Sequence, residues 1–207
     1  MSETAPVVDY FNLAMSFAWR PENDGQGPHN DRDDTGGETS WGVIFRTYSA
    51  WETAHGRTAD PAVFLTLPKE TFLPLYRANF WNACCCGSLD LIGIPMFDIG
   101  MMSGTGNAAR FLQMTLGVTV DEQIGPKTIA AFKAADPLDL NERLLTERDD
   151  FYRSLPNAAI FDGGWERRAS DCHDVTKSLI QRVQAGTPIS VLSTADLLRT
   201  AGLANVT

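Results

Sequence analysis

Apolar residues recur at helical spacing along most of this chain, and one polar stretch near the N-terminus interrupts them. The spacing is clear within Val7–Arg20 and Lys69–Cys86, and clearest within Asp139–Leu155, where Asp139 is the expected N-cap. Trp41–Trp51 is expected to be a strand that leads into a helix. A break at Ser103–Gly106 is expected to separate a helix at Pro95–Met102 from one at Asn107–Leu116. Further helices are expected after Ile124, at Phe161–Gln184 and at Ala195–Ala201. The sequence therefore predicts a mainly α protein.

The interrupting stretch, Pro21–Thr39, combines an acidic helix end with a glycine-rich turn. Glu22 follows the first apolar run, several aspartates come next, and the Gly36-Gly37 pair then delivers a hydroxyl at Thr39. Hydrolysis of a glycosidic bond needs one carboxylic acid that holds a proton and a second polar group that places water. Apolar neighbours such as Phe17 would raise the pKa of Glu22 and so keep it protonated. The stretch therefore indicates a glycosidase site.

Two other interpretations of these acidic residues stay open. A glutamate at a helix end is commonly a solvated surface group, and this applies to Glu22 and still more to Glu38, which lies inside the turn. The aspartate cluster resembles a calcium loop in composition, but its spacing lacks the D-x-[DN]-x-[DN]-G order.

Charge and apolar content exclude several classes of function. The chain of 207 residues has a formal net charge of −9, which argues against a nucleic-acid-binding protein that neutralises phosphates. It also argues against general attraction to anionic surfaces, so polymer binding would have to be local and stereospecific. We expect no transmembrane segment, and Met1–Asp9 shows no signal-peptide pattern, which favours a cytoplasmic location.

The cysteines and histidines do not have the spacing of metal ligands. Cys84-Cys85-Cys86 are contiguous and Cys172 stands apart, so the C-x-x-C spacing of metal sites is missing. We expect buried structural thiols. His29, His55 and His173 are scattered, and no metal site is predicted.

Several short motifs follow one another in order along the chain. They are Asp34-Thr35-Gly36-Gly37-Glu38-Thr39, then Leu75-Tyr76-Arg77 with Phe80-Trp81, and then Phe97-Asp98 with Ser103-Gly104. They resemble the D-P-G-G-x-T, I-Y-R-x-x-Y-W and F-D-x-x-V-N-S-G motifs of glycoside hydrolase family 108, whose members are N-acetylmuramidases found mostly as phage endolysins and bacterial cell-wall hydrolases. Ala108–Gln113, Ile124–Thr128, Phe151-Tyr152-Arg153 and Gly163–Arg168 resemble the peptidoglycan-binding region that follows in these proteins.

The resemblance covers roughly Phe11 to Lys177 and implies a fold and an activity. It implies a mainly α, lysozyme-like fold with a small β-element at the N-terminal catalytic cleft. Its regions would be a catalytic region at 1–92, a helical peptidoglycan-binding region at 93–186 packed on it as one unit, and an appendage at 187–207. The activity implied is hydrolysis of the β-1,4 bond between N-acetylmuramic acid and N-acetylglucosamine, by a monomer that needs no cofactor.

The resemblance also implies a role for individual residues. Glu22 matches the general acid, while Asp34 and Thr39 match the groups that hold the attacking water, an arrangement that favours inversion. The loop is three residues longer than the usual form, so Asp31 and Asp33 remain alternatives to Asp34.

Other aromatic and charged residues have two interpretations each. Trp41, Tyr76 and Trp81 are candidate sugar-stacking residues or core residues, and Asp98 is a candidate substrate contact or a structural group. Trp165 and Arg167 are expected to hold the C-terminal helix to the core.

Two alternative functions remain. One is a lytic transglycosylase, which also uses a glutamate, and the other is a peptidoglycan-binding phage component without activity. The biological setting that the resemblance implies is phage-type host lysis, an antimicrobial activity in which the protein stays in the host cytoplasm until it is released to the cell wall.

Overall fold

The computed structural model describes residues 10–20, 27, 38–156 and 158–187, and of residues 158–162 only the backbone. These residues are mostly helical, with one two-stranded antiparallel sheet among them. The chain divides into two compact units, a smaller one of residues 17–79 and a larger one of residues 1–16 and 80–207. The expected helix at Ala195–Ala201 lies outside the described residues. Among the described helices, none combines the length and the apolar character needed to cross a membrane.

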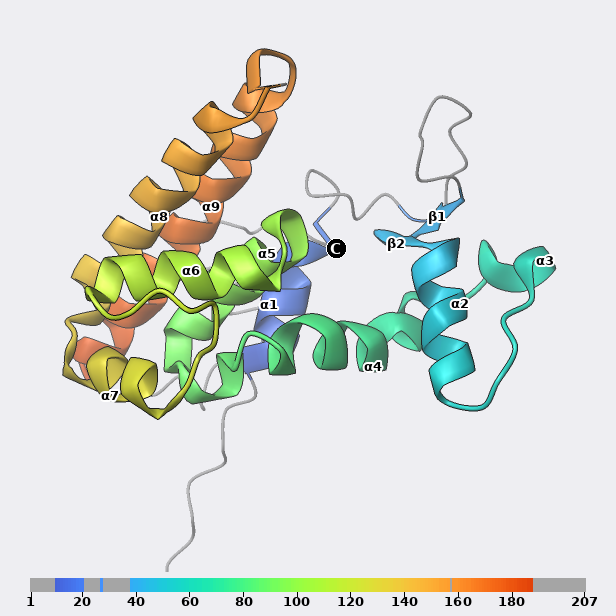
Figure 1. The fold of residues 1–207 in the computed structure, drawn as a ribbon, viewed down its shortest axis with the longest axis horizontal. Coiled ribbons are helices and arrows are strands. Elements are labelled where there is room, and N and C mark those ends of the chain that lie inside the picture. The colour runs from blue at the N-terminus through green and yellow to red at the C-terminus, as the bar shows by residue number, and fades with distance from the viewer. Residues whose placement is uncertain (1–9, 21–26, 28–37, 157, 188–207) are drawn as a thin grey trace, which may run out of the picture. The chain divides into compact units, whose positions relative to one another are not determined.

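The larger unit is a bundle of helices. Its helices are α1 (Tyr10–Ala18, whose last two residues belong to the smaller unit), the 3-10 turns η4 (Cys86–Ser88) and η5 (Asp90–Ile92), α5 (Gly93–Ser103), α6 (Thr105–Leu116), α7 (Pro126–Ala134), α8 (Pro137–Ser154) and α9 (Ala158–Gln184). The long helices α8 and α9 run side by side, and α5 packs against α6, α8 and α9 (Figure 1). The helices predicted at Pro95–Met102, at Asn107–Leu116, after Ile124, at Asp139–Leu155 and at Phe161–Gln184 are therefore confirmed.

Helix α5 is the central helix of this bundle, since every residue from Gly93 to Gly100 is buried. Two of its glycines allow close packing. A Cβ on Gly93 would lie 2.5 Å from the carbonyl oxygen of Cys86, and a Cβ on Gly100 would lie 2.7 Å from Sγ of Cys84. The helix ends at Gly104, whose φ of +89° favours glycine, so the predicted break before α6 is confirmed.

The cysteines are packing groups in this core. Cys84, Cys86 and Cys172 are buried, whereas Cys85 is partly exposed. Burial raises the pKa of the Cys86 thiol well above its usual range, and its contact with Cys84 raises it further. The prediction of buried structural thiols is confirmed for three of the four.

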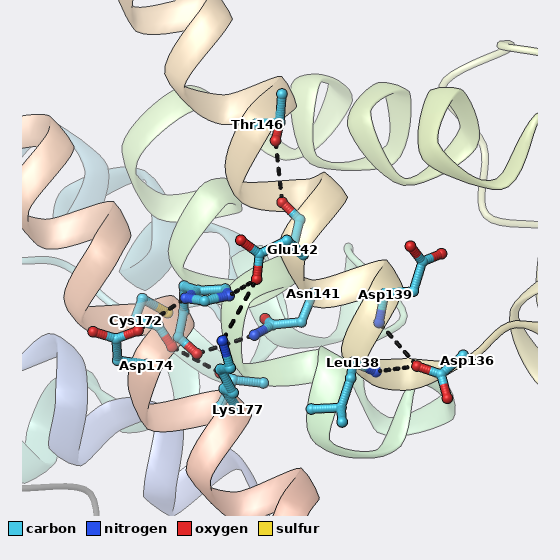
Figure 2. Close-up of polar contacts among 11 residues, drawn as sticks. Asp136, Leu138, Asp139, Asn141, Glu142, Thr146, Cys172, Asp174 and Lys177 are labelled. Atoms are coloured by element: carbon cyan, nitrogen blue, oxygen red, sulfur yellow. Dashed lines mark hydrogen bonds and ion pairs between the residues drawn. The ribbon is translucent and has the colours of Figure 1, made fainter.

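Helix α8 begins earlier than the sequence pattern indicated. Its N-cap is Asp136, whose carboxylate accepts hydrogen bonds of 2.9 Å from the backbone N–H groups of Leu138 and Asp139 (Figure 2). Pro137 takes the first helical position, where the missing N–H has no cost. The expectation that Asp139 caps the helix is therefore wrong.

Polar contacts fix α8 against α9. The Asn141 side chain donates a 3.0 Å hydrogen bond to the backbone oxygen of His173. The ring of His173 lies between two carboxylates, 2.9 Å from Glu142 and 3.0 Å from Asp174. Lys177 also approaches Glu142, at 3.8 Å, as Figure 2 shows. These contacts set the register of the two helices.

The smaller unit contains the hairpin and an aromatic core. Its elements are β1 (Thr39–Ser40), β2 (Val43–Ile44), α2 (Phe45–Ala54), α3 (Pro61–Phe64), the 3-10 turn η2 (Lys69–Phe72), α4 (Leu73–Tyr76) and the π-helical η3 (Arg77–Asn82), which continues into the larger unit. The rings of Tyr48, Phe64 and Phe72 pack together with centroids 5.5–6.0 Å apart. The prediction of a strand that leads into a helix is confirmed by β2 and α2 (Figure 1).

The predicted continuous helix over Lys69–Cys86 is wrong in its regularity. The segment changes from a 3-10 turn to an α-helix at Leu73 and then to a π-helix at Arg77. Pro74 has no N–H to donate to the preceding turn, so that turn does not continue as a regular α-helix through it.

Candidate active site

The candidate residues fall in different parts of the chain. Glu22 and Asp34, together with the alternatives Asp31 and Asp33, lie outside the described residues. Thr39, Trp41 and Tyr76 belong to the smaller unit, while Trp81 and Asp98 belong to the larger one.

Thr39 is held by backbone pairing at the start of the hairpin. It opens β1 and pairs with Ile44 of β2, and only 7% of its surface is exposed. Just before it, the backbone oxygen of Glu38 accepts a 2.9 Å hydrogen bond from the N–H of Phe45. The backbone that carries the predicted water-holding hydroxyl is thus fixed by β2 and by the first residue of α2.

The hairpin turns through Trp41 and Gly42. Both have positive φ, +52° and +82°, which is typical of the tightest two-residue turns between antiparallel strands. A tryptophan in this backbone region costs free energy and needs support from its surroundings. That support comes from two hydrogen bonds: Oη of Tyr76 donates to the backbone oxygen of Trp41 at 2.7 Å, and Nε1 of Trp41 donates to that of Leu67 at 3.3 Å.

Tyr76 supports the hairpin from α4. Its side chain is buried, and its ring meets that of Trp19 edge to face at 6.0 Å. The hydroxyl points at the turn so closely that a Cβ on Gly42 would lie 2.8 Å from it. These contacts agree with the interpretation of Tyr76 as a core residue. Its contact with a sugar ring stays a prediction.

Replacing Gly42 with alanine should lower the free energy of unfolding by about 1–3 kcal/mol, because the new Cβ meets the Tyr76 hydroxyl and the φ of +82° strains it. Thermal and urea unfolding measure the loss. Gly56→Ala is the matched control, since Gly56 has a similar φ of +71° with no described atom within 4 Å of such a Cβ. Equal losses in the two variants would show that the Tyr76 contact contributes nothing.

Trp81 lies in the core of the larger unit. Only 5% of its surface is exposed, and its ring is 5.6 Å from that of Phe11 and 6.0 Å from that of Phe97. These contacts agree with the interpretation of Trp81 as a core residue. Its contact with substrate stays a prediction.

Asp98 of α5 binds two arginines in the interior of the larger unit. One carboxylate oxygen accepts hydrogen bonds from Nε and Nη2 of Arg168, at 3.0 and 2.7 Å, and the other lies 2.6 Å from Nη2 of Arg148. Nε of Arg148 donates in turn to the hydroxyl of Tyr152 at 2.9 Å. We call Asp98, Arg148 and Arg168 the buried ion cluster; it joins α5, α8 and α9.

The electrostatics of the cluster keep Asp98 charged. Burial alone would raise the pKa of this carboxyl, but Arg168 and Arg148 outweigh that effect, so its pKa lies below the usual range. The cluster fits the structural role weighed for Asp98, and its direct contact with substrate stays a prediction.

Sequence reasoning missed the two arginines of the cluster. The residue expected to hold the C-terminal helix was Arg167, but that side chain is exposed and its neighbour Arg168 is the buried one. Trp165 does approach the core, 5.4 Å from the ring of Tyr152. A signal for Arg148 was present, since it falls on the apolar face of α8 in the series Leu140, Asn141, Leu144, Arg148 and Tyr152.

Two family models match consecutive parts of the chain. "Glycosyl hydrolase 108" matches residues 22–104, and "Predicted Peptidoglycan domain" matches residues 107–170. Among solved structures, that of Brucella abortus SagA is similar, with 28% sequence identity and a TM-score of 0.69 over 88% of this chain and 98% of that chain. No protein with a curated description matches the sequence. The predicted fold class, mainly α and lysozyme-like with a small β-element, is confirmed.

Proposed function

Because the chain belongs to glycoside hydrolase family 108 and carries a peptidoglycan domain, we propose that it cleaves the β-1,4 bond between N-acetylmuramic acid and N-acetylglucosamine. That it is a glycosidase directed at peptidoglycan follows from the family. Which glycosidic bond is cleaved is the more specific part of the proposal. The observation that carries it is the matched hydrolase segment, which begins at Glu22 and includes the hairpin that fixes Thr39.

The proposed mechanism uses one acid and one bound water. Glu22 protonates the glycosidic oxygen as the bond to the leaving sugar breaks, while Asp34 and Thr39 orient the water that attacks the other face of the sugar. Asp31 and Asp33 are the alternatives for the second carboxylate. The product would be a glycan end with free, reducing N-acetylmuramic acid of inverted configuration.

Trp41 is the aromatic residue that we propose for direct contact with the sugar. It is partly exposed, it lies two residues from Thr39, and two hydrogen bonds hold it in place. A fixed aromatic face can stack on the apolar face of a pyranose ring. In this proposal Tyr76 acts through Trp41, while Trp81 and Asp98 stabilise the larger unit.

The proposed setting is that of an endolysin. The protein would remain in the host cytoplasm, act as a monomer, and degrade the wall after release, with neither nucleic acid nor membrane insertion involved. This part of the proposal rests on the family resemblance and on the net charge of −9.

Analysis of the products from purified sacculi tests the proposal. We expect mass spectrometry after borohydride reduction to show glycan fragments that end in reduced N-acetylmuramic acid. Ends in 1,6-anhydro-N-acetylmuramic acid would identify a lytic transglycosylase instead, and reduced N-acetylglucosamine ends would place the cut at the other bond. Binding to sacculi with no release of fragments would identify a binding component.

A further inference from the structure

Helix α2 continues directly from the hairpin (Figure 1). Its exposed side carries a shallow, open depression that we call the α2 groove. It consists of two adjoining depressions of about 470 and 690 Å³, and all their lining residues belong to the smaller unit. The two depressions share Arg46, Ala50 and Ala54, which lie one turn apart along α2. The small side chains of Ala50 and Ala54 leave room for these depressions between the larger side chains of α2.

A fixed aromatic pair stands at one side of the groove. The rings of Trp51 and His55 have centroids 4.0 Å apart, and Nδ1 of His55 lies 2.8 Å from the backbone oxygen of Trp51. Since a carbonyl only accepts, Nδ1 donates this hydrogen bond and so holds the imidazole against the indole. Trp51 is partly exposed, so part of its surface is open to solvent. A rigid, accessible indole on a helix suits stacking with a sugar ring.

The charge of the groove is opposite to that of the chain as a whole. Its described lining residues include the positively charged Arg46 but neither Asp nor Glu, in a chain of net charge −9. The acidic residue within α2, Glu52, is buried and paired with Arg57 through hydrogen bonds of 2.7 and 2.8 Å. The chain as a whole repels anionic ligands because of its negative net charge. This groove would instead attract them locally.

The polar groups match those of a muramic-acid-containing strand. Arg46 is exposed, and its guanidinium can bind a carboxylate through two parallel hydrogen bonds. Peptidoglycan offers such carboxylates on the lactyl group of uncapped muramic acid and on stem peptides. Asn79, also exposed, can exchange hydrogen bonds with an N-acetyl amide.

We propose that this α2 groove binds a stretch of the peptidoglycan glycan strand away from the bond that is cleaved. Trp51 stacks on a sugar ring, Arg46 binds a carboxylate, and Asn79 contacts an N-acetyl group. The inference rests on the proposed function and adds a binding site to it. Because the groove would hold substrate and transition state alike, its loss should raise KM and leave kcat near the wild-type value.

Kinetics on soluble, uncrosslinked glycan strands test the groove. Trp51→Ala should raise KM about tenfold, which corresponds to about 1.4 kcal/mol of binding free energy. Trp51→Tyr should restore most of the affinity, because the ring is retained. Arg46→Ala should also raise KM, and its effect should shrink as salt is added, since an exposed ion pair is screened.

Two matched controls lie outside the groove. Val63→Ala removes an exposed apolar group from α3, and Lys69→Ala removes an exposed positive charge from η2, both within the same unit. Both should keep the wild-type KM. If Trp51→Ala and Arg46→Ala have the same KM as these controls, the groove does not bind the glycan. The proposed hydrolysis would remain intact.

Calorimetric binding of the same strands separates the two proposals. If the wild type releases no reducing ends, the proposed hydrolysis fails, and calorimetry of Trp51→Ala against the wild type still decides whether the groove binds glycan. Sedimentation is measured on the same samples. A Trp51→Ala variant that binds glycan normally but dissociates a dimer would identify the groove as a contact between copies of the chain, and would also overturn the proposal.

Discussion

Replacing Glu22 with glutamine should slow the release of reducing muramic acid ends from sacculi by about 10²–10⁴-fold, the range that a general acid contributes. An amide has nearly the size of the carboxylic acid and can still form hydrogen bonds, but it cannot protonate the leaving oxygen. We therefore expect the loss in kcat, with KM and thermal stability close to the wild type. Initial rates on sacculi and on soluble strands measure both quantities.

Nearby acidic residues supply the controls for this experiment. Glu38→Gln makes the same chemical change at a partly exposed position beside β1, and it should leave the rate near the wild-type value. Asparagine at Asp31, Asp33 and Asp34 in turn should give one variant with a large loss, which identifies the second carboxylate. A wild-type rate in Glu22→Gln combined with an inactive Glu38→Gln would transfer the role of acid to Glu38.

Replacing Asp98 with alanine should destabilise the protein by about 3–5 kcal/mol, the usual loss when one partner of a buried ion pair is removed. Two guanidiniums, Arg148 and Arg168, would remain in the interior without the carboxylate that they share. Urea unfolding measures the change. A loss of this size is a large part of the roughly 5–15 kcal/mol that holds a typical domain folded.

Two further variants separate charge from packing. Asp98→Asn keeps the size of the side chain, so most of the loss should persist if charge is the cause. Asp139→Ala breaks the exposed pair with Arg143, and such surface pairs contribute at most about 1 kcal/mol. A change in Asp98→Ala no larger than that of Asp139→Ala would show that the buried ion cluster does not stabilise the fold.

The cluster also predicts how stability depends on acid. The folded pKa of Asp98 lies below the usual aspartate value, so its contribution is present above about pH 4 and is lost as the pH falls through the folded pKa. The free energy of unfolding of the wild type should therefore fall with acid more steeply than that of Asp98→Asn. Parallel pH profiles for the two proteins would contradict this.

The sequence predicts local structure well where one physical signal dominates. The helical spacing of apolar residues located α6, α8 and α9, and the glycine at position 104 marked the break between α5 and α6. The prediction of local structure failed where two signals overlapped. The apolar pattern of Lys69–Cys86 continues through Pro74, and periodicity alone does not reveal that the backbone changes its helical type there.

The site is predictable only as far as chemistry can be recognised in short motifs. Thr39 and Trp41 were identified because they follow a glycine pair in a recognisable order. The support of Trp41 by Tyr76 joins residues 35 positions apart, and the pairing of Asp98 with Arg168 joins residues 70 positions apart. Such contacts depend on the packing of helices that spacing alone does not orient. For the same reason the sequence does not reveal that Arg168 is buried whereas Arg167 is exposed.

The buried ion cluster also bears on how this protein can change in evolution. Asp98 lies in the segment that matches the hydrolase family, whereas Arg148 and Arg168 lie in the segment that matches the peptidoglycan domain. Recombination between residues 104 and 107 with a segment that lacks the matching charges would bury either the carboxylate or the two guanidiniums without this ion cluster. Exchange of either segment therefore requires a partner segment that supplies the matching charges.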